Sequence, residues 1–598
     1  MKRSGTFAPG RWLIYLLPAS VFVVMLRLTW FRWGDFIIDT FRDQWVFLKL
    51  SQGAVLYRDV LYFYGFLPPY IIAFLNAFFG VHIKWTVYAG IAVSVATLVA
   101  LYRVSRYFFD RYISALILVQ VICVCFFSSW GIFNFILPYS VASTFFTCFL
   151  FFALFFFLGF VRKGRRVKLV PWAFFTCLAM LSRPDYGLMS WGVFFLVGLM
   201  RAKRSGGWKD MFGLALPPAC AAFLFAVFFS YAGGAGSFLK IVGGYSVFAC
   251  SKSQFSYALT GFDNIPGNLL LVFGVFVVFA GSLMLFRVIS PRISKMSEHQ
   301  GMTSGVYFAY AFSAAVGLFC GSWFGNVLGI AQYSMLPLLL VAVIVSAGYG
   351  NTKEDGRAQA LMTLCVALLS LVLIGRILLK VHPQGYGFFL LIPSMVSMYV
   401  FTFRMVPGAV RGFDPLSARA AYIYRIFAAC FLMMSMTFFL RGNIMYYRDR
   451  NVGIDLGGKG ELFFSPTERT YVFILLAEYL GKVMGPSDTL VVFPEGVALN
   501  YLLGKDNPLW METYVPDCVN IMGQEALAAA IKDKRVDYAV VFERDTTEYG
   551  YPVFGVDYAP DIKNLLKEDY HLDKVVDEIP FTGWGYGAIV LKRNDRDK

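Results

Sequence analysis

Long apolar runs are the feature that most restricts how this chain can fold. A helix needs roughly 20 apolar residues to cross the hydrocarbon core of a bilayer, and about thirteen stretches reach or approach that length. Hydrophobic residues make up 58% of the 598 residues, more than a water-soluble protein accommodates. We therefore predict a polytopic α-helical membrane protein with about 13 transmembrane helices. They are expected near residues 12–28, 84–102, 112–129, 138–160, 169–182, 186–200, 211–231, 266–287, 304–322, 329–348, 358–378, 387–404 and 421–439.

Basic residues between the apolar runs indicate the orientation of the chain. They gather in alternate loops, for example at residues 162–168 (RKGRRVK) and 201–204 (RAKR). Because cytoplasmic loops are enriched in Lys and Arg, we expect a cytoplasmic amino terminus and a first loop, residues 29–83, on the outer side. The first run is interpreted as a retained anchor, since no convincing cleavage site precedes Leu28. The same rule explains the net charge of +16, so no nucleic acid partner is expected.

The composition changes abruptly after about residue 440. Apolar residues now alternate as in soluble strands and helices, which predicts a small extracytoplasmic α/β domain at residues 441–598 beside a transmembrane domain at residues 1–440. This domain could serve either acceptor recognition or stability, and the sequence does not decide between the two. Strands are expected near 489–496, 537–543 and 587–593, and helices near 470–483, 498–504, 525–535 and 561–570.

A polar island follows the first apolar run. Asp35, Asp39 and Asp43 recur every four residues, so on a helix they would form one acidic stripe. The stripe is typical of a solvated surface helix, but it also suits a carboxylate that acts as a general base at the edge of the bilayer. Residues 68–81 (PPYIIAFLNAFFGV) are too short to span comfortably and are predicted to lie in the outer interface as an amphipathic helix.

The island carries a resemblance to a known family. Its order is Asp39-x-x-Arg42, then Gly53-x-x-x-Tyr57-Arg58-Asp59, then Tyr64-Gly65-Phe66-Leu67-Pro68-Pro69-Tyr70. This resembles the first extracytoplasmic loop of the GT-C superfamily of membrane glycosyltransferases, in particular the bacterial branch similar to protein O-mannosyltransferases and to the aminoarabinose transferase of lipid A. The resemblance covers roughly residues 1–440 in topology, and its motifs are concentrated in 35–80. The family's usual Asp-Glu pair is altered, because Thr40 follows Asp39.

The resemblance implies a chemistry and a location. It implies a multi-pass enzyme of the bacterial cytoplasmic (inner) membrane, surrounded by membrane lipids. The enzyme would move a sugar from a polyprenyl-phosphate carrier to a glycolipid, polysaccharide or protein acceptor at the outer face. A carboxylate of this loop would be the base, Asp39 or Asp43, and a single displacement would invert the anomeric centre. Asp59 or Asp43 would orient the base or hold a cation, so a divalent metal ion is left open as a cofactor.

Other outer-loop residues complete the candidate site. An Arg suits the departing lipid phosphate because its guanidinium binds phosphate oxygens in pairs, and Arg183 is the candidate, with pairing to Asp185 as the alternative role. Asn134 and Tyr139 suit sugar contacts or ordinary loop positions, and no His or Cys spacing predicts metal ligands. The candidate substrate-binding residues are Arg42, Asp59, Tyr64, Asn134, Tyr139, Arg183, His382 and Tyr386.

Two other classes of protein fit the same composition. A secondary transporter or flippase for a lipid-linked or envelope precursor would also have many helices, and a membrane scaffold would use the carboxy-terminal domain for binding. Transporters place ionisable groups at the bilayer midplane, on broken helices. Here the spans are nearly free of charge and the polar groups gather at the outer edge, which favours the glycosyltransferase.

Overall fold

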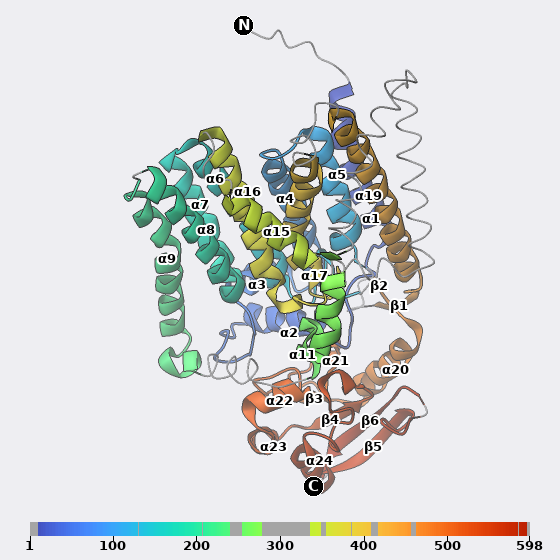
Figure 1. The fold of residues 1–598 in the computed structure, drawn as a ribbon. Helices are drawn as coiled ribbons and strands as arrows, with labels where there is room; N and C mark the ends of the chain where they lie inside the picture. Colours follow the sequence, from blue (N-terminus) through green and yellow to red (C-terminus); the bar gives the residue numbers. More distant parts are fainter. Residues whose placement is uncertain are drawn as a thin grey trace.

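The structure is a computed structural model in which a helical bundle stands on a small β-sheet (Figure 1). It describes residues 10–128, 131–205, 207–239, 254–274, 276–277, 335–348, 354–383, 385–407, 417–455, 462–583 and 585–594. The run expected at 304–322 lies outside these residues, as do parts of the runs at 266–287 and 329–348 and the last residue of the run at 112–129.

The bundle contains six described helices that are long and apolar enough to cross a membrane. The chain is therefore a multi-pass membrane protein, while the expected total of about thirteen spans stays a prediction. The six are α4 (Ile83–Ser105), α6 (Val141–Lys163), α9 (Asp210–Tyr231), α16 (Glu354–Leu373) with η5 (Ile374–Ile377), α17 (Gly387–Val400) with η6 (Phe401–Met405), and α19 (Ser417–Arg448). Other bundle helices are α1 (Gly10–Leu28), α5 (Arg111–Val121) with η1 (Ile122–Phe126), α7 (Leu169–Ser182), α8 (Pro184–Ser205) and α15 (Met335–Gly348).

Helix α6 runs through the middle of the bundle and packs against α4 and α7. Its sequence is apolar all round, as expected for a helix that is covered by neighbours on most sides. Phe151, Phe157 and Trp172 are fully buried between α6, α7 and the adjoining helices. Stacked and tilted aromatic rings therefore supply much of the packing in this part of the core.

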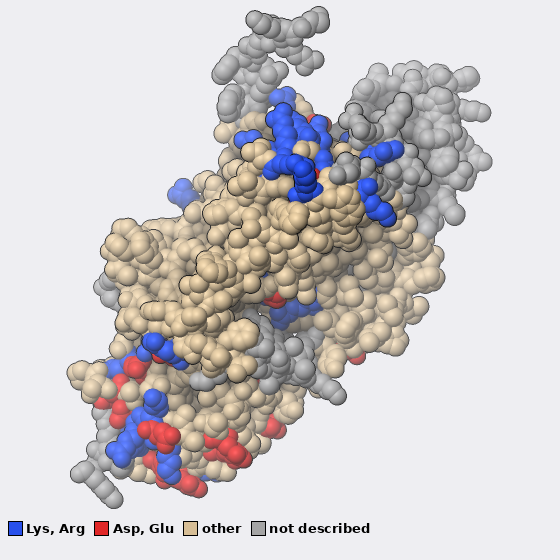
Figure 2. Space-filling model, turned by 90° about the vertical axis from the view of Figure 1, so that its left-hand side faces the viewer, with Lys and Arg blue, Asp and Glu red and all other residues tan. Residues whose placement is uncertain are grey.

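Basic side chains gather at the end of the bundle farthest from the sheet (Figure 2). Residues at this end include Arg103 and Arg106 at the end of α4, and Arg162 and Lys163 at the end of α6. A broad band with few charged side chains separates this end from the sheet (Figure 2). This distribution has the form that the positive-inside rule describes.

The first loop, residues 29–82, lies between the bundle and the sheet and contains α2 (Thr40–Ser51) and α3 (Leu67–Phe79) (Figure 1). The helix predicted at 68–81 is found as α3, which exposes the rings of Phe74, Phe78 and Phe79, and its place in the membrane interface stays a prediction. The predicted acidic stripe is wrong, because α2 begins only after Asp39. The Asp35 carboxylate instead accepts hydrogen bonds from the next backbone amides, a local turn that competes with a helix.

The carboxy-terminal segment, residues 462–594, carries a four-stranded sheet in the order β3-β4-β6-β5. Strands β3 (Leu490–Phe493) and β4 (Tyr538–Phe542) are parallel, whereas β6 (Gly587–Arg593) pairs antiparallel with β4 and with β5 (Tyr570–Asp577). Strand β5 was not expected, because this edge strand is half polar and follows a helix directly. The helices are α20 (Thr467–Val483), α21 (Ala498–Leu503), α22 (Pro516–Met522), α23 (Gln524–Asp533) and α24 (Pro560–Asp569). A separate hairpin of β1 (Val452–Asp455) and β2 (Leu462–Ser465) precedes them.

Polar contacts hold the first loop against the carboxy-terminal segment. The backbone amide of Leu61 donates to the carbonyl of Trp510 at 2.9 Å, and the Trp510 indole donates to the carbonyl of Tyr57 at 3.3 Å. Lys49 forms an ion pair of 2.6 Å with Asp506. The loop is therefore fixed on the side that faces away from the membrane-spanning helices.

Candidate active site

A cavity of about 1050 Å³ opens where the bundle, the first loop and the carboxy-terminal segment meet. Charged side chains are visible in a recess at this level of the molecule (Figure 2). The cavity brings together seven of the residues singled out from the sequence: Asp39, Arg42, Tyr64, Tyr139, Arg183, His382 and Tyr386.

Asp39 lies at the start of α2 in a strained backbone conformation, which the surrounding structure must stabilise. Its φ of 48° and ψ of −57° place it at the centre of a γ-turn, in which the amide of Thr40 donates to the carbonyl of Ile38 at 2.5 Å. Backbone strain of this kind is concentrated at functional sites. The carboxylate accepts a hydrogen bond of 2.6 Å from Arg42 and keeps about 24% of its surface exposed to the cavity.

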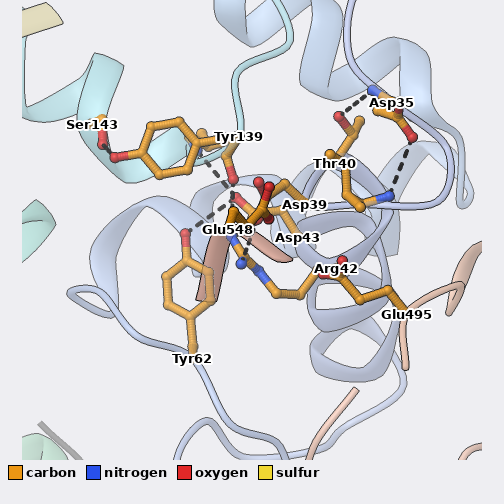
Figure 3. Close-up of polar contacts among 12 residues, drawn as sticks. Asp35, Asp39, Thr40, Arg42, Asp43, Tyr62, Tyr139, Ser143, Glu495 and Glu548 are labelled. Atoms are coloured by element: carbon orange, nitrogen blue, oxygen red, sulfur yellow. Dashed lines mark hydrogen bonds and ion pairs between the residues drawn. The ribbon is translucent and has the colours of Figure 1, made fainter. Parts of the chain in front are cut away.

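Arg42 connects Asp39 to the buried side of the loop. One guanidinium nitrogen, Nη1, binds Asp39, and the other, Nη2, donates to the backbone carbonyl of Tyr139 at 3.0 Å. The same Nη2 lies 3.6 Å from Oδ1 of Asp43. Figure 3 shows the side chains of Asp39 and Asp43 close to that of Arg42. Burial raises the pKa of Asp39 and the Arg42 charge lowers it, so the two effects oppose each other at the candidate base.

Asp43 lies behind Arg42 and does not line the cavity. Its carboxylate is 1% exposed and accepts hydrogen bonds from the amide of Val141 at 3.1 Å and the hydroxyl of Tyr62 at 3.4 Å. Burial raises the pKa of Asp43 to about 7. The geometry therefore favours Asp39 as the carboxylate that meets a substrate, and Asp43 as a group that positions Arg42.

Arg183 forms a second cationic centre, at the junction of α7 and α8. Its guanidinium binds both oxygens of Asp185, at 3.0 and 2.7 Å, and donates to Ser143 at 2.9 Å. It lies 4.5 Å from the ring centre of Tyr64 and 4.7 Å from that of Tyr186. Arg183 therefore forms the pair with Asp185 that was considered from the sequence as its alternative role. It also lines the cavity, where it could contact a phosphate group.

Tyr139 joins the two cationic centres. Its carbonyl accepts from Arg42 at 3.0 Å, and its hydroxyl accepts from Arg183 at 3.4 Å. Its ring packs edge-on against Tyr386, 5.2 Å between centroids. Tyr139 therefore fixes the position of the Asp39–Arg42 pair relative to Arg183.

Arg376 and Lys380 add positive charge on the same wall. The guanidinium carbon of Arg376 lies 4.1 Å from the ring centre of Tyr386, and Lys380 pairs with Asp263 at 2.6 Å. Within the described part of the chain, Arg376 forms neither an ion pair nor a hydrogen bond. A partly buried guanidinium without a counter-ion is suited to an anionic ligand.

Two other candidates lie away from the cavity. Asp59 pairs with its neighbour Arg58 at 2.8 Å, and both side chains are well exposed. Asn134 is fully buried and makes four hydrogen bonds to the backbone of its own turn, which favours the alternative of an ordinary loop position. No group of three His, Cys, Asp or Glu side chains in the described residues is placed to hold a metal ion.

Several cavity residues come from the carboxy-terminal segment and were not expected in the site. Glu495 follows β3 and Arg544 follows β4, so both stand beyond the carboxyl ends of adjacent parallel strands. Arg544 binds Glu495 at 2.9 Å and Glu548 at 2.6 Å. Ligands of α/β folds bind at this edge, and the Phe-Pro-Glu-Gly turn at 493–496 was the available sequence signal.

Comparisons with known proteins bear on the fold. No protein-family model and no curated protein matches the sequence. Among solved structures, ArnT from Cupriavidus metallidurans bound to undecaprenyl phosphate aligns with a TM-score of 0.50 over 98% of each chain, at 11% identity. The oligosaccharyltransferase AglB from Archaeoglobus fulgidus aligns with a TM-score of 0.48 over 97% of this chain and 74% of its own, also at 11% identity. The likeness to ArnT shows that the two chains share a fold over nearly their whole length.

Proposed function

We propose that this protein is a membrane glycosyltransferase that moves a sugar from a polyprenyl-phosphate carrier to an envelope acceptor. The observation that carries the proposal is the pairing of a strained carboxylate with a group of cations in one cavity at the end of the bundle. Asp39 and Arg42 form one part of this arrangement, and Arg183 and Arg376 form the other.

Asp39 acts as the general base in this proposal. The acceptor hydroxyl gives its proton to the Asp39 carboxylate while its oxygen attacks the anomeric carbon, and the bond from that carbon to the phosphate oxygen breaks. The pKa of Asp39 is raised by burial, which makes the carboxylate a stronger base, whereas the charge of Arg42 lowers this pKa and favours the ionised form. One displacement of this kind inverts the anomeric centre.

The lipid phosphate leaves toward the cationic wall. It gains negative charge as the sugar departs, and guanidinium groups fixed in place stabilise that charge without reorganising. Arg376 has no counter-ion in the described structure and is the first candidate contact, with Arg183 beside it. Undecaprenyl phosphate, the lipid bound by ArnT in the aligned structure, is a suitable probe.

The proposal includes an orientation and a division into domains. The basic end of the bundle would face the cytoplasm of a bacterium, and the cavity would face outward across the inner membrane. Residues 1–440 would form the membrane domain, and residues 441–598 would form an extracytoplasmic α/β domain over the cavity. Cysteine accessibility to a membrane-impermeant reagent, at introduced sites near Arg162 and near Glu525, tests the orientation.

The decisive experiment compares Asp39→Asn with wild type in lipid nanodiscs. Transfer of label from lipid-linked sugars to envelope acceptors should be lost, whereas binding of undecaprenyl phosphate should be retained. Arg376→Gln should weaken the binding of that lipid at least about tenfold, because one charge-assisted contact is lost. Arg166→Gln is the matched control and should change neither, because Arg166 is an exposed arginine outside the cavity whose partner Asp210, at the start of α9, also pairs with Arg201. Full transfer by Asp39→Asn would end this assignment of the base.

A further inference from the structure

The cluster of Glu495, Arg544 and Glu548 faces Asp39 across the cavity. All four residues line it, and the charge of Asp39 adds to the burial that raises the pKa of Glu495 to about 7. Glu495 and Glu548 likewise act on the pKa of Tyr549, which lies beside them. The carboxy-terminal segment therefore places its own polar groups opposite the candidate base.

Arg544 is fully occupied by the protein. Its Nε binds Glu495, its Nη2 binds Glu548, and its Nη1 donates to the carbonyl of Asp545. A guanidinium with three partners and two carboxylates around it is not available to a second anion. This contrasts with Arg376, on the opposite wall, which has no counter-ion in the described structure.

The two glutamates keep hydrogen-bonding capacity toward the cavity. Glu495 is 8% exposed, and only its Oε2 is bonded, to Arg544. Its Oε1, like Oε2 of Glu548, accepts no hydrogen bond from any residue that the structure describes. Carboxylate oxygens held in place by an arginine can accept hydrogen bonds from hydroxyl groups.

Charge divides the cavity into two halves. The wall from the bundle and the first loop carries five cationic side chains and three carboxylates: Arg42, Arg183, Arg376, Lys380 and Arg450 with Asp35, Asp39 and Asp185. The wall from the carboxy-terminal segment carries three carboxylates and two guanidinium groups: Glu495, Asp517 and Glu548 with Arg469 and Arg544. An anionic donor phosphate is favoured on the first wall, and an anionic acceptor is disfavoured on the second.

We propose that the Glu495–Arg544–Glu548 cluster is the acceptor subsite and that it selects an uncharged sugar with free hydroxyl groups. The inference rests on the proposed function and narrows its acceptor class. Glu495 and Glu548 accept hydrogen bonds from the acceptor sugar and hold the attacking hydroxyl near Asp39. A phosphate-bearing acceptor that enters this cluster meets the carboxylates of Glu495 and Glu548, and the Arg544 guanidinium is already bound to both of them.

The test uses the full-length protein in nanodiscs. Radiolabelled lipid-linked sugars, extracted from cells grown on labelled glucose, serve as the donor. Acceptors from a strain lacking the gene are split into an organic and an aqueous phase, and each phase is split by anion exchange into uncharged and anionic pools. The label should enter an uncharged pool, and the phase identifies a glycolipid or a polysaccharide. Label that enters the anionic pools overturns the inference, and transfer to no pool overturns the proposed function itself.

Variants separate acceptor binding from donor binding. Glu495→Gln and Glu548→Gln should each raise the KM for the uncharged acceptor at least about tenfold and leave the KM for the donor within about twofold. Glu568→Gln, an exposed carboxylate outside this cavity, should change neither. Glu548 is 42% exposed, so its variant is expected to fold even if the Glu495 variant does not. An unchanged acceptor KM in a folded Glu548→Gln protein rejects the subsite.

Discussion

Arg42 donates a hydrogen bond of 2.6 Å from its Nη1 to Oδ1 of Asp39. The arginine also reaches the carbonyl of Tyr139 and the carboxylate of Asp43, so its position is fixed from three sides. This pair links the charge of the candidate base to the buried core of the first loop. The ionisation of Asp39 therefore depends on a residue that need not touch the substrate.

Replacement of Arg42 by Lys should change the pH dependence of transfer. Lysine cannot bind Asp39 and the Tyr139 carbonyl together, so the pKa of Asp39 loses part of the effect that lowers it. Because the base must be ionised, the acid limb of the kcat/KM profile should move to higher pH, and the maximum should fall at least about tenfold. Transfer rates between about pH 5 and pH 9 measure this shift. Arg58→Lys, which changes a pair outside the cavity, is the control, and an unshifted limb in Arg42→Lys would separate Arg42 from the base.

Removal of the Asn134 side chain should affect stability and leave substrate recognition unchanged. Asn134→Ala leaves the buried amides of Ile136 and Leu137 and the carbonyl of Leu137 without this partner, which should cost on the order of 3 kcal/mol. The apparent Tm in detergent should fall, whereas KM values should stay near those of the wild type. Asn451→Ala, at an exposed position outside the helices and strands, should change stability by no more than about 0.5 kcal/mol. A raised KM with an unchanged Tm in Asn134→Ala would show instead that Asn134 contacts the substrate.

The length and periodicity of apolar runs in the sequence predicted much of the fold. The apolar runs that fall within the described residues correspond to helices of the bundle, and the strands β3, β4 and β6 lie where β-branched and apolar residues alternate with turns. The start of α2 was misplaced because the hydrogen bonds of the Asp35 carboxylate decide it, and residue spacing does not contain that information.

The composition of the site was only partly predictable, because its walls come from distant parts of the chain. Asp39, Arg183 and Tyr386 belong to outer loops that topology places at one end of the bundle. Glu495 and Arg544 meet Asp39 only through the docking of the carboxy-terminal segment, which depends on contacts such as Lys49–Asp506, 457 residues apart. A contact between residues so far apart cannot be predicted from the local sequence around either of them.

Glu512 should make the stability of the protein fall as the pH rises. Its side chain is 3% exposed, its Oε2 has no hydrogen-bond partner in the described structure, and burial raises its pKa to about 8. The carboxyl is therefore protonated in the folded state while it ionises in the unfolded state, so stability is lost between about pH 4.5 and pH 8. Two charged groups also act on the pKa of Glu512: Asp43 raises it and Arg42 lowers it. The Arg42 charge therefore reduces the loss of stability at high pH.

Glu512→Gln should flatten this dependence. The variant cannot ionise, so its stability relative to the wild type should rise with pH, by an amount on the order of 3 kcal/mol by pH 8. Apparent Tm values in detergent at several pH values measure the difference. Asp43 continues to titrate in both proteins with a pKa of about 7, so a residual slope is expected in the variant. A difference that does not change with pH would show that Glu512 is ionised in the folded protein.

Gly65 couples the first loop to the end of α7, and its replacement should disturb both halves of the site. Its amide donates to the carbonyl of Ser182 at 3.0 Å, and a Cβ atom would lie 2.0 Å from the carbonyl oxygen of Leu181. The backbone must therefore shift in Gly65→Ala, and Arg183, the next residue after Ser182, must move relative to Tyr64 and Asp39. A loss of stability of roughly 1–3 kcal/mol and a fall in transfer of at least about tenfold are expected. Gly192→Ala is the control, because a Cβ there meets no atom within 4 Å. Transfer at the wild-type rate by Gly65→Ala would show that the loop and α7 act independently.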